Sequence, residues 1–367
     1  MTDHVLNFSA GPAVLPRPVL EAAAGYISEI PGMGGGALEI SHRSPWFTDV
    51  IGEAEANLRL LLDIPPTYRV VFCQGGASQQ FSMLAMNFLR GRGAAAQYVL
   101  TGAWGSKAAA EARKEGDVLI AWTGKDDGFR RVPTDQELTE VLTSDAAFVH
   151  VTANETIQGV EFPATPAVPS GVELFCDMSS DFLSRPVDIG RYGLVYAGAQ
   201  KNAGPAGVTV AIVREDLLER IPDGLPSMLD YRTFVEHGSL YNTPPVFSIL
   251  VLMLVTRWLR DDVGGLDEQF ERNRRKAGVL YGAIDTGAGF YRGHVESASR
   301  SLMNVTWTLP TPELEHRFIT QAAANGMVEL KGHRSVGGIR ASVYNAMPIE
   351  GAEALAAFMT TFTAANG

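Results

Sequence analysis

The chain has few of the features that mark a secreted or membrane protein. It has two cysteines among 367 residues, Cys73 and Cys176, and both fall within apolar segments, so we expect buried reduced thiols and no disulfide framework. Its most apolar run, Val246–Val255, is too short to cross a bilayer and predicts a buried core helix. The N-terminus lacks a basic segment followed by an apolar one, so no signal peptide is predicted. These absences favour a cytoplasmic protein.

Positive charge is also scarce. Thirty Lys and Arg residues face 41 Asp and Glu residues, which gives a formal net charge of −11. This balance disfavours general attraction to nucleic acid or to an anionic membrane, so we predict neither as a partner. The sequence also lacks metal-ligand spacing, a Ser-His-Asp triad and the glycine patterns of the Walker and Rossmann loops. Any phosphate must therefore be bound by local groups of another kind.

What is present predicts an α/β protein of about two domains. Short β-rich runs alternate with alanine-rich helical stretches, which is typical of a mostly parallel sheet with helices on both faces. The expected strands are 69–73, 98–100, 118–122, 147–152, 172–177, 194–197 and 208–213, with helices expected at 79–89 and 106–114. After residue 262 the composition changes: a charged helix at 267–276 and strands at 304–309 and 338–344 predict a smaller α+β domain.

Lys201 is the first candidate for chemistry. It lies among glycines in the stretch 197–207, between two apolar strands, and is not placed to solvate a helix face. A desolvated amine can form a Schiff base with an aldehyde. Asp177 ends the strand 172–177, and pyridoxal phosphate requires one lysine for its aldehyde and one carboxylate for its pyridinium nitrogen. Polar residues also occur at strand ends for structural reasons, and that alternative stays open at this point.

Three further features follow strand ends, where the active groups of such sheets collect. The loop Gln74–Ser78 joins a strand to a helix, and its small residues would let backbone N–H groups close on a phosphate, although a plain turn is the alternative. Trp104 could stack on a planar ring or pack in the core. The Thr156 hydroxyl could form a hydrogen bond with a phenolic oxygen, or serve in a helix cap or turn.

Arginine occurs in three clusters. They contain His42 with Arg43, His333 with Arg334, and Arg340. The planar guanidinium fork suits carboxylates and phosphates, so these clusters are candidate anion sites, with solvated surface arginines as the alternative.

These residues together resemble one family, the phosphoserine aminotransferases, which are fold-type-I enzymes dependent on pyridoxal phosphate (PLP). The resemblance runs nearly end to end. It rests on the segments Asn7–Pro12, Ser41–Arg43, Phe72–Gly76, Asn154–Ile157, Tyr196–Asn202, Tyr241–Pro245, Met303–Val305, Leu330–Arg334 and Arg340–Met347.

The resemblance implies a large PLP-binding domain with a mostly parallel seven-stranded sheet over 17–261, a small C-terminal α+β domain over 262–367, and an N-terminal segment, 1–16, that packs with the small domain. It implies that Lys201 binds PLP covalently and that Asp177 holds the ring nitrogen. The other implied cofactor contacts are Ala77, Ser78, Trp104, Thr156 and Gln200, with Asn242 and Thr243 contributed by the partner subunit of a homodimer. The implied substrate contacts are Arg340 for the α-carboxylate, and His42, Arg43, His333 and Arg334 for the distal phosphate or carboxylate, some of them across the dimer interface.

The expected reaction is reversible transamination of 3-phosphohydroxypyruvate with L-glutamate, giving O-phospho-L-serine and 2-oxoglutarate, as in serine biosynthesis. Formation of 4-phosphohydroxy-L-threonine for PLP synthesis is a related expectation. Two alternatives stay open: another fold-type-I aminotransferase or lyase, such as a serine:glyoxylate-type enzyme, and a catalytically silent PLP-binding protein. The arginine clusters argue against the first, since a neutral side chain would not need them. The presence of both Lys201 and Asp177 argues against the second.

Overall fold

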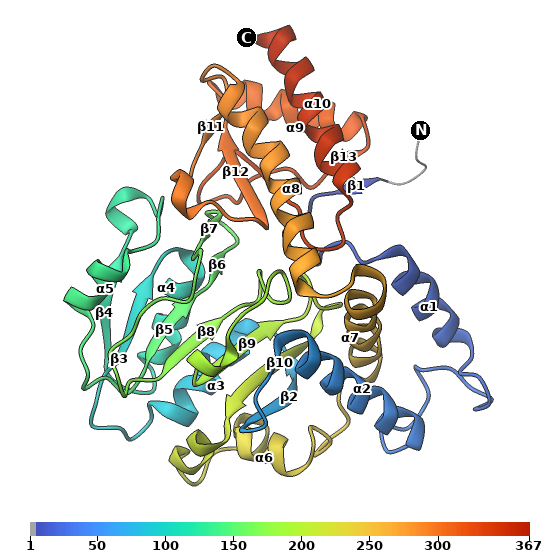
Figure 1. Ribbon diagram of the computed structural model, residues 1–367, viewed down its shortest axis with the longest axis vertical. Coiled ribbons are helices and arrows are strands. Elements are labelled where there is room, and N and C mark those ends of the chain that lie inside the picture. Colours follow the sequence, from blue (N-terminus) through green and yellow to red (C-terminus); the bar gives the residue numbers. More distant parts are fainter. Residues whose placement is uncertain (1–4) are drawn as a thin grey trace.

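A computed structural model describes residues 5–367 of the chain. Residues 1–4, the beginning of the predicted N-terminal segment and of the stretch read for a signal peptide, lie outside the described residues. The described chain forms a large α/β part and a smaller part above it, joined by a long helix, α8 (Leu266–Thr286) (Figure 1). No helix between residues 5 and 367 is both long and apolar enough to cross a membrane.

A seven-stranded sheet forms the centre of the large part. Its strand order is β2-β10-β9-β8-β5-β3-β4. Only β10 runs antiparallel to its neighbours, β2 and β9, so the prediction of a mostly parallel sheet is confirmed. The strands are β2 (Tyr68–Gly75), β3 (Ala96–Leu100), β4 (Val118–Thr123), β5 (Val149–Thr152), β8 (Leu174–Asp177), β9 (Leu194–Gly198) and β10 (Gly207–Arg214).

Helices cover both faces of this sheet, because successive strand residues point to opposite sides. Along β2, Val70 and Phe72 join one apolar core while Val71 and Cys73 join the other. The first core is completed by α1 (Arg17–Ser28), α2 (Pro45–Leu62), α5 (Asp135–Val141) and α7 (Val246–Trp258), and the second by α3 (Ala77–Phe88), α4 (Ala103–Ala112) and α6 (Tyr231–Glu236). Cys73 and Cys176 are both buried and free, as expected.

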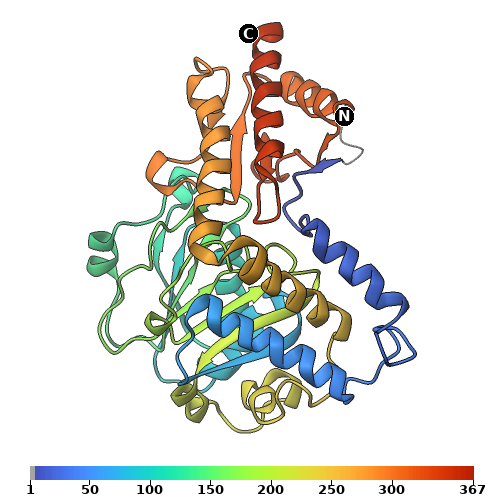
Figure 2. The ribbon, with the colours of Figure 1, turned by 45° about the vertical axis from the view of Figure 1, so that its right-hand side comes forward.

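The smaller part has its own core around Trp307 and Phe318. A three-stranded antiparallel sheet, β11-β12-β14, lies beside α8 and α10, and β1 pairs in parallel with β13 (Figure 2). Phe8 enters this core directly after β1. The elements are β1 (Leu6–Asn7), β11 (Arg292–Gly293), β12 (Asn304–Thr308), α9 (Pro312–Ala324), β13 (Met327–Val328), β14 (Ile339–Ser342) and α10 (Ile349–Asn366).

A buried hairpin links the two parts. It consists of β6 (Asn154–Glu155) and β7 (Val160–Glu161), and it follows β5 of the central sheet. Asn154 Nδ2 donates to Asn304 Oδ1 at 2.8 Å, and Thr306 Oγ1 donates to Gln158 O at 2.8 Å, so β12 of the small part is hydrogen-bonded to this hairpin. The remaining elements are short helical turns at Lys125–Asp127, Ile189–Arg191, Glu215–Arg220, Ser227–Leu229, Leu259–Val263 and Ser297–Ser299.

Candidate active site

A cavity of about 300 Å³ lies at the carboxyl ends of the central strands. Parallel α/β sheets generally bind ligands at this edge. The seven residues that the sequence predicts as cofactor contacts within one chain all line this cavity: Ala77, Ser78, Trp104, Thr156, Asp177, Gln200 and Lys201. The structure therefore brings together side chains that are up to 124 positions apart, from Ala77 to Lys201.

Lys201 lies on the turn that follows β9 and is only 9% exposed. Its Nζ donates to Thr156 Oγ1 at 2.6 Å and lies 5.8 Å from the centre of the Trp104 ring. Burial lowers the pKa of Lys201 to about 8, although the carboxylates of Asp177 and Glu155 partly oppose the shift. An amine that loses its proton near neutral pH is a competent nucleophile and base.

Asp177 is the last residue of β8, and its carboxylate is buried. Burial raises the pKa of Asp177, and hydrogen bonds from Ser179 together with the charge of Lys201 oppose that shift. The Ser179 N–H donates to Asp177 Oδ1 at 2.8 Å and fixes the carboxylate at the cavity wall. A buried carboxylate is stabilised by a cationic partner, so this position suits the protonated nitrogen of a heteroaromatic ring.

The first turn of α3 forms another wall of the cavity. Its N-cap is Gly76, which offers no side chain to the free N–H groups of the helix. The preceding Gly75 has φ +89°, a left-handed conformation that favours glycine. An uncapped helix N-terminus presents backbone donors and a positive dipole end, which suits a phosphate.

A group of cations lies beside the cavity, on β14 and the loop before it. Arg340 Nη1 donates to Thr156 O at 3.4 Å, and the buried Arg340 Nε has no partner among the described residues. Burial lowers the pKa of His333, and the nearby cations Arg340, Arg334 and Lys107 lower it further. Lys107 Nζ also lies 4.2 Å from the centre of the Trp104 ring. Arg340, Arg334 and Lys107 therefore place positive charge beside the cavity.

The structure does not bring the remaining predicted residues into this cavity. His42 and Arg43 precede α2, where Arg43 is exposed and His42 Nε2 is buried without a partner among the described residues. Asn242 and Thr243 do not line the cavity, although Gln74 Nε2 donates to Thr243 O at 3.0 Å.

Sequence reasoning missed several residues that shape the site. Glu155 is fully buried and receives hydrogen bonds from the start of α4. Lys107 lies over the Trp104 ring, one helical turn away from it in sequence. Asn202, next to Lys201, accepts a hydrogen bond from the Asn345 N–H at 3.0 Å. The sequence pointed to Glu155 and Asn202 only indirectly, because they are next to Thr156 and Lys201 in the segments Asn154–Ile157 and Tyr196–Asn202.

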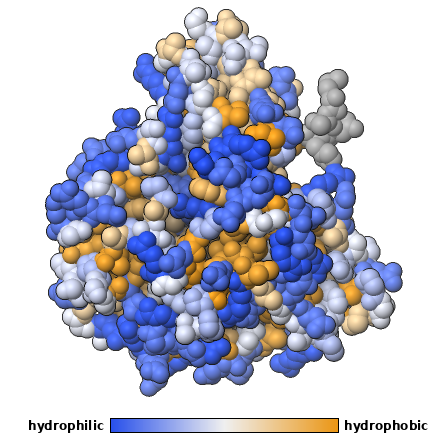
Figure 3. All heavy atoms as spheres, in the orientation of Figure 1, coloured by the Kyte–Doolittle hydropathy of each residue, from blue (hydrophilic) through white to orange (hydrophobic). Residues whose placement is uncertain are grey.

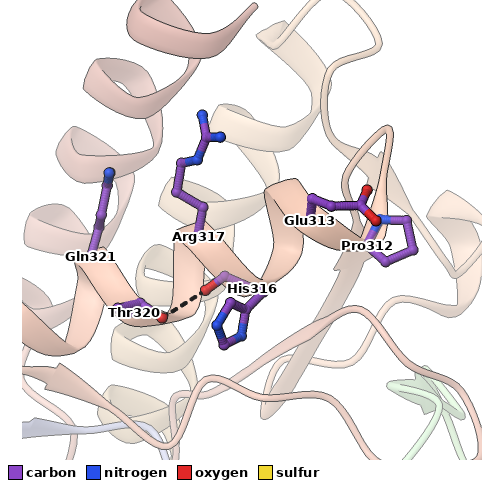
Figure 4. A pocket seen from close by; sticks show the side chains of 6 residues that line it. All are labelled: Pro312, Glu313, His316, Arg317, Thr320 and Gln321. Carbon is purple, nitrogen blue, oxygen red and sulfur yellow. Dashed lines mark hydrogen bonds between the residues drawn. The ribbon is translucent and has the colours of Figure 1, made fainter.

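Neither a metal centre nor the cavity along α9 offers a comparable set of side chains among the described residues. Residues 5–367 contain no group of three His, Cys, Asp or Glu residues able to hold a metal ion. A separate cavity of about 640 Å³ runs along the outside of α9, and Figure 4 shows its side chains, among them His316 and Arg317, projecting from a single helix. The hydrogen bond drawn there, from Thr320 Oγ1 to His316 O at 2.9 Å, is internal to that helix.

Comparisons with known proteins agree with this site. The aminotransferase class-V family model matches residues 5–355. The phosphoserine aminotransferase of Laribacter hongkongensis is 52% identical over 363 residues, which cover 99% of each chain. Among solved structures, a phosphoserine aminotransferase from Bacillus circulans subsp. alkalophilus has a TM-score of 0.96 at 49% identity and covers all of both chains. A PLP-bound phosphoserine aminotransferase from Trichomonas vaginalis has a TM-score of 0.91 at 36% identity and covers 97% of this chain and 100% of that one.

The resemblance read from the sequence is thus confirmed, along with the PLP-dependent aminotransferase fold. The chain belongs to the aminotransferase class-V family, within its phosphoserine aminotransferase group.

Proposed function

We propose that this chain transfers an amino group from L-glutamate to 3-phosphohydroxypyruvate, giving 2-oxoglutarate and O-phospho-L-serine, with PLP bound covalently to Lys201. Relatives that are about 50% identical over nearly the whole chain are named phosphoserine aminotransferase. The observation that carries the proposal is one cavity that holds a deprotonatable lysine, a buried carboxylate, an aromatic ring and an open helix N-terminus. Phosphorylated hydroxythreonine would present the same two anionic ends and is a related product.

The residues present fit PLP. Asp177 would hold the ring nitrogen, Trp104 the ring face, and Thr156 the ring hydroxyl. The first turn of α3 at Ala77 and Ser78, with Gln200, would hold the phosphate. When bound, PLP supplies an electron sink that stabilises negative charge at the substrate Cα.

The protein side chains have distinct tasks in this chemistry. Lys201 Nζ, with its pKa lowered to about 8, can take the proton from the substrate Cα and later return a proton. The Thr156 hydroxyl orients that amine through its 2.6 Å hydrogen bond. Asp177 would keep a proton on the ring nitrogen, because Ser179 and Lys201 offset the burial of its carboxylate only in part and a cation beside it would complete the compensation.

The cationic groups account for substrate choice. Arg340 would bind the α-carboxylate that both substrates share, since its Nε is buried and unpartnered among residues 5–367. His333 and Arg334 would bind the distal anion together with His42 and Arg43 contributed across the dimer interface. That anion is a phosphate in one substrate and a carboxylate in the other. Bidentate arginine pairing suits both groups.

A homodimer would complete the site, with Asn242 and Thr243 of each chain reaching the phosphate in the other. Apolar side chains stay exposed on and between α1 and α2: Leu20, Ile27, Met33, Leu38 and Leu60. Figure 3 shows further hydrophobic patches across the middle of one face of the large part. Exposed apolar surface of this kind often marks an interface. Sedimentation should give twice the 39.5 kDa chain mass, and a mass of one chain would contradict the proposal.

A cytoplasmic location and the domain bounds 1–16, 17–261 and 262–367 remain predictions.

Replacing the lysine tests the proposal. Lys201→Ala removes one amine and little core packing, so the folded protein should lose the absorbance of covalently bound PLP and all but a trace of turnover. Lys114→Ala is the matched control, since Lys114 lies on the surface and is paired with Glu111. Both variants should keep the circular dichroism spectrum of the wild type. Substantial transamination in Lys201→Ala would rule out Lys201 as the covalent site.

A further inference from the structure

Glu155 is a fully buried carboxylate without a role in the account above. It lies on β6, between Asn154 and Thr156, and its side chain has no exposed surface. The Trp104 N–H donates to Glu155 Oε2 at 2.9 Å and the Gly105 N–H donates to Glu155 Oε1 at 2.8 Å. Both N–H groups belong to the first turn of α4, so one carboxylate holds the start of a helix 50 residues away in sequence.

The helix has no other means of capping these groups. Its N-cap is Gly102, which makes no side-chain hydrogen bond. The one remaining donor of the turn, the Ala103 N–H, donates to Gln158 Oε1 at 3.3 Å, in the same loop as Glu155. A Cβ on Gly102 would lie 2.4 Å from Glu155 Cδ, so the glycine leaves the space that the carboxylate fills. The start of α4 and the 155–158 loop therefore fit each other closely.

The anchored turn carries the aromatic wall of the cavity. Trp104 provides its backbone N–H to Glu155 and its ring to the cavity, where Lys201 Nζ lies 5.8 Å from the ring centre. The indole Nε1 is buried and has no partner among the described residues. The ring is thus held by packing and by the backbone of residues 103–105, and the backbone is held by Glu155.

We propose that Glu155 is a positioning residue, whose carboxylate fixes the first turn of α4 and thereby holds the Trp104 ring against the ring of the bound cofactor. This inference rests on the proposed function, because it takes the ring of Trp104 to stack on PLP. Glu155 also interacts electrostatically with Asp177 and Lys201, and burial raises the pKa of Glu155 to about 7. A direct effect of its charge on Lys201 is the competing explanation that the test must separate.

The test measures PLP affinity by equilibrium titration of the apoprotein in a double-mutant cycle. Glu155→Gln keeps the shape but points an amide donor at backbone donors, so at least one hydrogen bond is lost. In the presence of Trp104, we expect PLP binding to weaken about ten- to a hundredfold. In a Trp104→Ala background, Glu155→Gln should change the affinity less than about twofold. Glu111→Gln, on the exposed side of the same helix, is the control and should leave the affinity unchanged.

Equal losses in both backgrounds would overturn the proposal, because Glu155 would then act on Lys201 or on general stability. An independent readout needs no cofactor: hydrogen exchange in the apoprotein should be faster for the Trp104 and Gly105 amides in Glu155→Gln, with the amides of Ala108 and Ala109 unchanged. A uniform acceleration of hydrogen exchange along α4 would also contradict the proposal. If Glu155→Gln does not fold, Glu155→Asp serves in the same cycle, because it keeps the charge but shortens the reach. A wild-type protein that binds no PLP would instead refute the proposed function.

Discussion

Burial prepares individual side chains of this site for chemistry. Lys201 and Asp177 are ordinary ionisable groups, yet the cavity lowers the pKa of the lysine to about 8 and raises the pKa of the carboxyl. In both cases desolvation is the largest cause. Each shift costs folding free energy, since a charge is held away from water. Cofactor and substrate bring compensating charges, so we expect binding to stabilise the fold.

Replacing two arginines should distinguish binding of the α-carboxylate, which both substrates share, from binding of the distal group, which differs between them. Arg340→Ala should slow the glutamate and phosphoserine half-reactions about equally, because both substrates carry the α-carboxylate. Arg334→Ala should slow the phosphoserine half-reaction more, because a phosphate offers three acceptor oxygens. A lost charge-assisted hydrogen bond costs about 1.5–3 kcal/mol, or about ten- to a hundredfold in kcat/KM. The measurement is single-turnover kinetics of each half-reaction.

The control for this series is Arg317→Ala. Arg317 lies on α9, and its Nη1 donates to Asn366 Oδ1 at the end of α10. It should leave both half-reactions at the wild-type rate. Equal losses for the two substrates in Arg334→Ala would show that Arg334 does not discriminate, and would move the distal-anion site to Arg43 or another residue.

At the scale of elements, the two helices that line the cavity begin without side-chain caps. The N-caps of α3 and α4 are Gly76 and Gly102. The first turn of α3 lines the cavity, whereas the first turn of α4 donates a backbone hydrogen bond to Glu155. Sequence reasoning placed these helices correctly but began them two to three residues late, at Gln79 and Ser106. Polar N-cap residues are the usual start signal, and here a distant residue or a ligand takes that task.

Helix α8 carries a second buried lysine, which predicts a pH dependence of stability. Lys276 Nζ donates to Tyr344 O at 2.6 Å and to Asn345 O at 3.2 Å. Burial lowers the pKa of Lys276 in the folded state to about 7, below the value near 10.4 of an unfolded chain. Between these pH values the unfolded state binds more protons, so the contribution of Lys276 to the free energy of unfolding rises with pH, by at most about 1.4 kcal/mol per unit.

Urea denaturation at a series of pH values from 7 to 9 checks this prediction, by comparison of wild type with Lys276→Met and with the surface control Lys114→Met. The wild-type and Lys114→Met curves should rise with pH more steeply than the Lys276→Met curve. Parallel curves for all three proteins would show that the pKa of Lys276 is not lowered in the folded state.

At the scale of the whole molecule, the site lies where the two parts of the chain meet. The large part supplies Lys201, Asp177 and the start of α3, and the small part supplies Arg340 on β14. The alternation of strands and helices predicted the sheet, because each strand of a buried sheet is a continuous apolar run. The family motifs predicted the residues that line the cavity. Neither could predict Glu155 or Lys107 as neighbours of Trp104, because those contacts depend on how the hairpin 154–161 and α4 pack in space.

The central claim is that this enzyme acts on a phosphorylated amino acid, and the most direct test compares O-phospho-L-serine with L-serine as amino donor to 2-oxoglutarate. Serine lacks the distal anion, so it forfeits the charge-assisted hydrogen bonds of at least one arginine. We predict a kcat/KM for phosphoserine at least about a hundredfold above that for serine, measured as glutamate formed. Equal values for the two donors would contradict the account and favour a serine:glyoxylate-type enzyme, and the absence of glutamate with either donor would favour a silent protein.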